Sequence, residues 1–333
     1  MDARSRRIIL KRYPQGVPTA ADFELTEAPL SEPQAGELLV ETHWLSMDPA
    51  PRMRMTAGAH GALAPGGTVI GRGVGVVRES RHPSFSVGDW VAGELGWQEH
   101  AVLAPAGLRR VDPSLGAVQH ALGVLGPSGI AAWCLVRLAA KVQAGDTVIV
   151  SAAAGSVGSV ALQLVTIEGA RAVGIIGGER QAQFVRDVLG VASLIDYRST
   201  RLDADLERAC PQGANVFLDS VGGSLHEAVM QRIADHARIV AFGYISRYNE
   251  SSGAAPEYGR IYQLIRRRAT LSGFLIADYA EYFDRALSEL SGLVASGRLK
   301  YVESVSLGLD SAPAAFARLF DPDPVGKQLV RVI

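Results

Sequence analysis

Residues 146–178 read DTVIVSAAAGSVGSVALQLVTIEGARAVGIIGG, and this stretch decides the fold. Residues 146–151 are β-rich and apolar, as expected of a parallel strand that is buried on both faces. A glycine-containing turn follows through Gly158, and apolar residues then recur at helical spacing until a stop at Gly169. Residues 171–176 form a second β-rich run. The order of strand, glycine turn, helix and strand predicts a βαβ unit of the dinucleotide-binding type.

The glycines of this turn have distinct expected tasks. Gly155 lets the backbone approach a pyrophosphate, and Gly158 lets the helix pack closely on the strand. The helix N-terminus then offers free N–H groups to the anion. The first glycine of the usual motif is replaced by Ala153. An ordinary strand-to-helix turn remains the alternative interpretation.

The end of the second strand predicts which dinucleotide binds. An NAD enzyme would place Asp or Glu there to accept hydrogen bonds from the adenosine ribose. This chain instead has Gly177 and Gly178, followed by Glu179 and Arg180. Arg180, with Tyr197 and Arg198 at the end of the next strand-like run, favours the extra phosphate of NADPH. Glu179 argues the other way unless it points to solvent.

Composition indicates a two-domain enzyme of the cytoplasm. At 333 residues the chain exceeds what one core usually supports. The 33 basic and 34 acidic residues nearly balance, so no charge field indicates nucleic acid or an anionic membrane. No apolar run reaches the length of a membrane span or a signal peptide. Two cysteines, Cys134 and Cys210, cannot build a disulfide framework.

The pattern changes near residue 130. Eleven of the 16 prolines come before it, among short β-like runs that predict a barrel-like β domain: 23–27, 37–45, 74–78, 89–92 and 100–103. After it, strands and helices alternate as in an open doubly wound sheet. The expected strands are 194–198, 216–219, 238–242 and 270–276, and the expected helices are 202–210, 225–233, 258–268 and about 281–296. Residues 300–306 and 328–333 return to β character.

Several motifs in this order resemble the zinc-independent medium-chain dehydrogenase/reductase superfamily. The resemblance is closest to its leukotriene/prostaglandin reductase branch of NADPH-dependent alkenal and enone double-bond reductases, and it covers nearly the whole chain. The motifs are Leu45-Ser-Met-Asp-Pro49 with Arg52 and Met55, Gly88-Asp-Trp-Val91, Gly96-Trp-Gln-Glu99, Gly123-Val-Leu-Gly126, Ser151–Ser159, Asp219-Ser-Val-Gly-Gly223, Gly243-Tyr-Ile-Ser-Arg-Tyr-Asn249, Gly273-Phe274 and Gly326-Lys327.

The resemblance implies an α/β fold with two domains. A GroES-like β-barrel domain is built from both chain ends, residues 1–125 and 298–333, and a Rossmann doubly wound parallel sheet occupies residues 126–297. The active cleft would lie at their junction. The partners it implies are a small α,β-unsaturated carbonyl substrate and a second copy of the chain in a homodimer, without nucleic acid or membrane.

The family pattern also implies an NADPH site. Its pyrophosphate would lie on Gly155, Ser156, Val157 and Gly158, and its 2′-phosphate near Gly178, Arg180, Gln181 and Tyr197. Further contacts would come from Ser220, Phe242, Gly243, Tyr244, Ile245, Ser246, Tyr248, Phe274, Leu275 and Ile276.

Some positions depart from that pattern. Gln181 stands where the family has a Lys for the 2′-phosphate, so Arg180 or Arg198 would have to compensate. Ser220 and Pro324 each replace an Asn. Ala50, followed by Pro51, replaces a Tyr, which predicts a wider substrate pocket.

Reduction of an enone predicts one further residue type. Hydride addition to the β-carbon leaves negative charge on the carbonyl oxygen, which one neutral donor can stabilise. Tyr248 matches the family position, and a phenol stays protonated at pH 7. A Tyr packed at a strand end is the alternative, with Tyr244 and Tyr262 as competing donors. Trp97 is expected either to line the substrate pocket or to pack within the barrel.

Three functions remain open at this point. The first is NADPH-dependent reduction of the carbon–carbon double bond of enals or enones. The second is a quinone oxidoreductase of the same superfamily, and the third is a non-catalytic NADPH-binding sensor. A zinc site is not expected, because neither cysteine lies at a ligand spacing. A Ser-His-Asp hydrolase lacks its Gly-x-Ser-x-Gly motif.

Overall fold

The strand that opens the glycine motif has residues packed on both of its faces. In a computed structural model, which describes residues 4–250, 261–321 and 323–333, this strand is β8 (Thr147–Val150). Val148 and Val150 belong to one apolar cluster, and Ile149 between them belongs to another. Because successive side chains point to opposite faces, β8 requires cover on both sides.

The strand lies in a six-stranded parallel sheet with the order β10-β9-β8-β11-β12-β13. The other five strands are β9 (Arg171–Ile176), β10 (Leu194–Asp196), β11 (Ala214–Asp219), β12 (Ile233–Ala241) and β13 (Thr270–Gly273). Read in chain order, this is the 3-2-1-4-5-6 arrangement of the doubly wound fold, whose switch point lies between β8 and β11. The predicted Rossmann sheet is confirmed.

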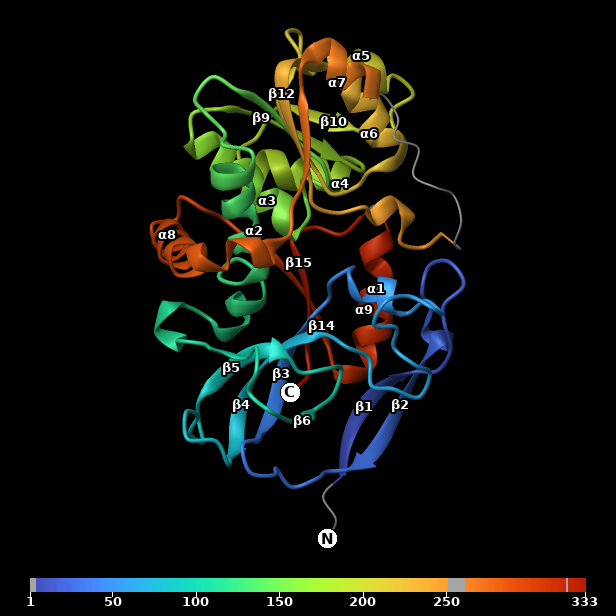
Figure 1. Ribbon diagram of the computed structural model, residues 1–333, viewed down its shortest axis with the longest axis vertical. Helices are drawn as coiled ribbons and strands as arrows, with labels where there is room; N and C mark the ends of the chain where they lie inside the picture. Colours follow the sequence, from blue (N-terminus) through green and yellow to red (C-terminus); the bar gives the residue numbers. More distant parts are fainter. Residues whose placement is uncertain (1–3, 251–260, 322) are drawn as a thin grey trace. The chain divides into compact units, whose positions relative to one another are not determined.

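Helices cover both faces of this sheet (Figure 1). One face carries α2 (Pro127–Cys134), α3 (Ser156–Ile167), α4 (Glu179–Gln183) and α8 (Phe283–Ala295). The other carries α5 (Leu202–Ala209) and α6 (Gly223–Met230), with α7 (Ile261–Arg267) beside them.

Both chain ends contribute to a second, β-rich unit. Its strands are β1 (Arg4–Leu10), β2 (Phe23–Pro29), β3 (Leu38–Ser46), β4 (Arg72–Ser80), β5 (Trp90–Glu94), β6 (His100–Leu103), β7 (Arg109–Arg110), β14 (Glu303–Leu307) and β15 (Lys327–Arg331). They form a two-stranded sheet, β1-β2, and a seven-stranded sheet in which β15 pairs with β3. The short helices α1 (Pro51–Arg54) and α9 (Ala312–Ala317) complete the unit. This is the expected GroES-like domain.

The contacts divide the chain into residues 1–123, 303–321 and 327–333 on one side and residues 124–302 and 322–326 on the other. The sequence placed the boundaries at 125 and 297. It did not predict that residues 323–326 return to the Rossmann unit. Among the described residues, none of the helices is both long and apolar enough to cross a membrane.

Two expected elements end earlier in the structure, and a third lies partly outside the described residues. The helix expected over 225–233 ends at Met230, because Ile233 already pairs with Ala214 in the sheet. The strand expected over 270–276 ends at Gly273, and a 3₁₀ helix begins at Ile276. Part of the helix expected over 258–268, residues 258–260, lies outside the described residues.

Candidate active site

The glycine turn after β8 exposes a helix start. Gly155 donates its N–H to the carbonyl of Ala152 over 2.9 Å, and α3 begins at the next residue. A Cβ on Gly158 would overlap the Ala152 carbonyl, so only glycine lets the helix approach the turn this closely. The amides of Ser156, Val157 and Gly158 lie in the first turn of α3, where no intrahelical acceptor exists for them. They therefore suit a pyrophosphate.

The C-terminal return of the chain supports this turn. Gly326 donates its N–H to the carbonyl of Ala154 over 2.7 Å and forms a bridge with Gly155. Its φ is +65°, and a Cβ there would overlap the carbonyl of Val302. Residues 323–326 thus belong to the Rossmann unit. Sequence reasoning noted the Gly326-Lys327 motif without predicting this contact.

The corner after β9 and β10 is basic. Gly178 has a φ of +120°, and a Cβ on it would overlap the guanidinium of Arg198. The side chain of Arg198 therefore lies directly over the backbone of Gly178, with an ion pair of 3.4 Å to Asp196. Arg180 is exposed, and Tyr197 is 45% exposed. Two arginines and a phenol at one corner suit a phosphate monoester.

Gln181 and Glu179 have other partners at this corner. The Gln181 side chain accepts a hydrogen bond from the Gly177 N–H (2.8 Å) and donates one to the carbonyl of Pro324 (3.0 Å). It ties the turn after β9 to the C-terminal return. Glu179 forms an exposed ion pair of 3.8 Å with Arg186. Its charge is therefore balanced within its own helical segment, which removes the main sequence argument against NADPH.

Two turns meet beyond β11 and β12. Ser220 accepts a hydrogen bond from the N–H of Ile245 (3.1 Å), and Val221 accepts one from the N–H of Ser246 (3.2 Å). The backbone of Gly243 packs against Ser220, where a Cβ would meet the Ser220 carbonyl at 2.9 Å. Because β8, β11 and β12 are parallel, these turns lie at the same carboxyl end of the strands as the glycine turn after β8.

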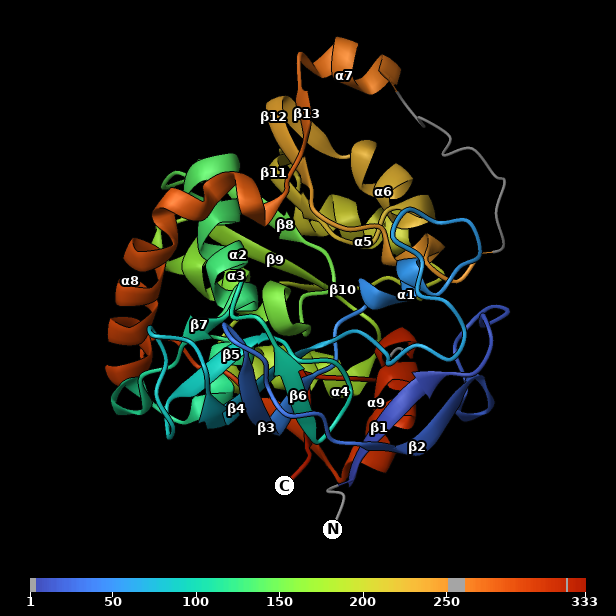
Figure 2. The same ribbon diagram turned by 60° about the horizontal axis from the view of Figure 1, so that its bottom comes forward.

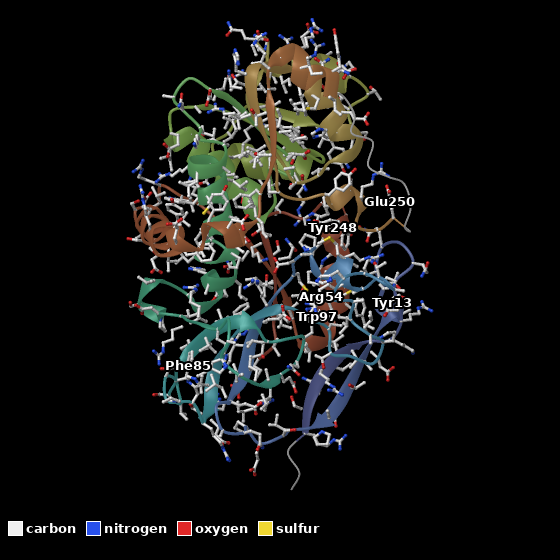
Figure 3. All side chains as sticks on the ribbon, in the orientation of Figure 1. Tyr13, Arg54, Phe85, Trp97, Tyr248 and Glu250 are labelled. Atoms are coloured by element: carbon white, nitrogen blue, oxygen red, sulfur yellow. The ribbon has the colours of Figure 1, made fainter. Side chains whose placement is uncertain are left out.

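Tyr248 follows a single 3₁₀ turn, Ile245–Arg247, at this end of the sheet (Figure 3). Its phenol oxygen accepts a long hydrogen bond of 3.4 Å from the N–H of Tyr244. That contact uses a lone pair and leaves the phenol proton for another acceptor. The Tyr244 side chain contacts Arg247, whose pKa is raised by hydrogen bonds first to Glu250 and then to Tyr244.

The remaining expected cofactor residues occupy the ends of β12 and β13. Phe242 donates its N–H to the carbonyl of Asp219 over 2.8 Å. The Phe274 N–H bonds the carbonyl of Ala241, and the Phe274 ring stacks on Tyr279 with centroids 5.0 Å apart. Leu275 is 62% exposed, and Ile276 begins the following 3₁₀ helix.

In the β-rich unit, an ion pair fixes the segment before Ala50. Lys327, 5% exposed, contacts a carboxylate oxygen of Asp48 at 2.5 Å, and the Ser46 hydroxyl donates to the other at 2.6 Å. Burial raises the pKa of Asp48, but Lys327 and these hydrogen bonds outweigh it and hold that pKa below its ordinary value. The contacts set the start of the turn into α1, where Ala50 and Pro51 lie.

Trp97 occupies the core of the same unit. It is 1% exposed, and its ring lies 5.6 Å from that of Phe23 and 5.4 Å from that of Phe316 between centroids. This is the packing that was one of its two expected roles. Tyr262, the weaker competitor for the donor role, is 69% exposed on α7.

Neither cysteine resembles a metal ligand or a nucleophile. Burial raises the pKa of the Cys134 thiol and of the Cys210 thiol to about 11 each. Within the described part of the chain, no three His, Cys, Asp or Glu side chains are grouped so as to hold a metal ion.

Comparison with known proteins agrees with this arrangement. Residues 6–111 match a family described as the N-terminal domain of oxidoreductase, and residues 156–292 match one described as zinc-binding dehydrogenase. The chain is 32% identical to the NADPH-dependent curcumin reductase of Escherichia coli, over 99% of this chain and 97% of that protein.

The chain belongs to the zinc-independent alkenal/enone reductase family of the medium-chain dehydrogenases/reductases. It is 31% identical to the 2-alkenal reductase (NADP⁺-dependent) of Nicotiana tabacum, over 99% of this chain and 98% of that protein. CurA from Vibrio vulnificus, solved in complex with NADPH, superimposes with a TM-score of 0.92 at 33% identity, covering 98% of this chain and 99% of CurA.

Proposed function

We propose that this chain catalyses the NADPH-dependent reduction of the carbon–carbon double bond of α,β-unsaturated aldehydes and ketones. The observation that carries the proposal is the placement of Tyr248. Its phenol lies at the same carboxyl end of the Rossmann strands as the glycine turn. The phenol oxygen accepts a hydrogen bond from the amide of Tyr244. Family membership supports the substrate class.

The residues present fit NADPH. The amides at the start of α3 would hold the pyrophosphate. Arg198 over Gly178, with Arg180 and Tyr197 beside it, would hold the 2′-phosphate. Gln181 does not replace the charge of the family lysine, because its side-chain amide is neutral and is used in hydrogen bonds to Gly177 and Pro324. Arg198 and Arg180 therefore take over that charge.

When bound at this site, NADPH would supply the hydride that adds to the β-carbon of the substrate. Tyr248 donates a hydrogen bond to the carbonyl oxygen, which becomes negative as the hydride arrives. The phenol, or water behind it, then delivers a proton to the α-carbon. The amide of Tyr244 orients the phenol oxygen so that its O–H remains available for the substrate. Ala50, where the family has a Tyr, supports a preference for bulky or cyclic enones.

Tyr248→Phe tests the mechanism. Loss of one donor to an oxyanion typically lowers turnover by ~10²–10³, while the NADPH dissociation constant should change little because the ring remains. Single-turnover hydride transfer to an enone measures the first, and fluorescence titration measures the second. Wild-type hydride transfer in this variant would exclude Tyr248 as the donor, and Tyr244→Phe is the comparison.

A substrate panel tests the reaction class. Turnover of enals and enones, followed by nicotinamide absorbance, should exceed turnover of quinones and secondary alcohols. Faster turnover of quinones would instead assign the chain to quinone reduction. Tight NADPH binding without turnover of any compound would favour a sensor.

We further propose that the protein forms a homodimer through β13. This strand is the outer strand of the Rossmann sheet, beside β12 (Figure 2), and all four of its residues are exposed. Large exposed apolar side chains occur on β13 (Leu271, 42%), two residues after it (Leu275, 62%) and on α7 (Ile261, 57%; Ile265, 70%). Within the described residues β13 pairs only with β12, and an edge strand with exposed apolar residues suits antiparallel pairing with its own copy. Light scattering should give twice the chain mass, and Leu271→Glu should shift it toward the monomer.

A further inference from the structure

A buried carboxylate lies at the end of β11, beside the glycine turn. Asp219 is 2% exposed. One of its oxygens accepts hydrogen bonds from the amides of Val221 (2.9 Å) and Gly222 (3.0 Å) and from the hydroxyl of Ser151 (3.4 Å). Burying a carboxylate is costly unless its oxygens are hydrogen-bonded, and four donors surround this one.

The fourth donor is His226 on α6. Its Nδ1 lies 2.8 Å from the second carboxylate oxygen of Asp219. Because an ionised carboxylate only accepts, Nδ1 carries the proton. The ring also lies against Phe217, with centroids 6.0 Å apart. His226 thus fixes the rotation of the Asp219 carboxylate from the side opposite the turn.

Asp219 in turn shapes residues 220–223. Capture of the Val221 and Gly222 amides bends the chain into a left-handed conformation, with φ of +70° at Gly222 and +61° at Gly223. The turn then directs its carbonyls to the neighbouring segment: Val221 accepts from the amide of Ser246 (3.2 Å) and from its hydroxyl (2.6 Å).

The same turn supports the tyrosines. A Cβ on Gly222 would overlap the ring of Tyr244, so that ring packs directly on the glycine backbone. The Tyr244 amide donates to the Tyr248 phenol. A continuous path therefore runs from His226 through Asp219, the turn at residues 220–223 and Tyr244 to the phenol oxygen of Tyr248.

From this path we infer that His226 and Asp219 are positioning residues for Tyr248. They fix the phenol in the orientation that an enolate oxygen needs and contact no reacting atom themselves. The inference rests on the proposed function, since it assigns a task to residues behind the proposed donor. It extends that function by making the reaction depend on a histidine outside the cofactor-binding segments.

The test begins with His226→Leu and His226→Asn in the full-length protein. Leu removes the donor to Asp219, while the Asn side-chain amide can place an N–H near the position of Nδ1. A displacement of a catalytic group by about 1 Å can cost ~10²-fold in rate. In His226→Leu we expect a smaller displacement of the Tyr248 phenol, which should slow single-turnover hydride transfer roughly tenfold. His226→Asn should recover most of that rate. NADPH affinity should stay within about twofold in both variants, since the glycine turn and the basic corner are unchanged.

Ser224→Ala provides the matched control, because Ser224 is exposed on the same helix. It should match the wild-type rate. If His226→Leu fails to fold, Asp219→Asn replaces it, since that change keeps the shape of the side chain while converting one acceptor into a donor. Equal rates in His226→Asn and His226→Leu, both low, would contradict a role through the hydrogen bond.

A double-mutant cycle with Tyr248→Phe separates the two proposals. If His226 acts through the phenol, His226→Leu should slow the wild type but add almost nothing in the Tyr248→Phe background. Independent, multiplying losses would overturn the positioning role and leave the proposed function intact. Wild-type hydride transfer in Tyr248→Phe alone would overturn the proposed function whatever His226 does.

Discussion

Arg198→Ala should reduce the preference for NADPH over NADH. The guanidinium lies over Gly178, at the position that the 2′-phosphate of the cofactor would approach. A charge-assisted hydrogen bond contributes about 1.5–3 kcal/mol. Arg198 is 45% exposed on its side chain and shares its charge with Asp196, so the lower end of that range applies. A loss of about 1.4 kcal/mol is a factor of ten.

The assay is steady-state kinetics with each cofactor at fixed enone concentration. We expect the wild-type ratio of kcat/KM for NADPH over NADH to be of the order of tens and to fall roughly tenfold in Arg198→Ala. The efficiency with NADH should change little, because NADH lacks the phosphate. Arg180→Ala should also lower the ratio of kcat/KM for NADPH over NADH. Comparing the two variants shows how much each arginine contributes to recognition of the 2′-phosphate.

Arg208→Ala is the matched control, because Arg208 is an exposed arginine of the Rossmann unit that lies on α5 and pairs with Asp205 instead. It should leave the ratio near the wild-type value. A wild-type ratio in both Arg198→Ala and Arg180→Ala would refute the assignment of this corner to the 2′-phosphate. Gln181→Lys offers a further check, since it restores the family cation but breaks the tie between Gly177 and Pro324.

Other predictions concern stability, reactivity, pocket shape and metal. Burial raises the pKa of Glu303, so its contribution to stability is present below its unfolded pKa and is lost as the pH rises through its folded pKa. Glu303→Gln should therefore raise the melting temperature at pH 7 but not at pH 4, and an equal shift at both would contradict this. Cys134 and Cys210 should resist a thiol reagent in the native protein and react fully in denaturant, since burial holds both thiols protonated. Ala50→Tyr should favour short linear enals over cyclic enones, and an unchanged preference would remove Ala50 from the pocket. Chelators should leave activity intact; loss that zinc restores would refute metal independence.

Local patterns determined the fold class. The apolar run of β8, the glycine turn and the helical spacing of α3 occupy one continuous stretch, so their order along the chain was sufficient to predict a Rossmann unit. The short strands of the first hundred residues predicted the β-rich domain in the same way. Boundaries were less determined: Ile233 has the apolar character of a helix face, and only its pairing with Ala214 made it a strand residue.

The candidate site followed from sequence only where a motif carried it. Tyr248, the glycine turn and Asp219 stand in recognisable segments, but nothing in the sequence paired Asp219 with His226, seven residues further along. They meet because β11 ends at Asp219 and α6, which carries His226, begins at Gly223. Likewise, the sequence showed that Gln181 is not a lysine, but not that its amide bonds Pro324, 143 residues further along the chain. The sequence determines the chemistry of each side chain. Which acceptor each donor finds is decided only when segments distant in the chain meet at the same end of the sheet, because hydrogen bonds depend on distance and direction in space.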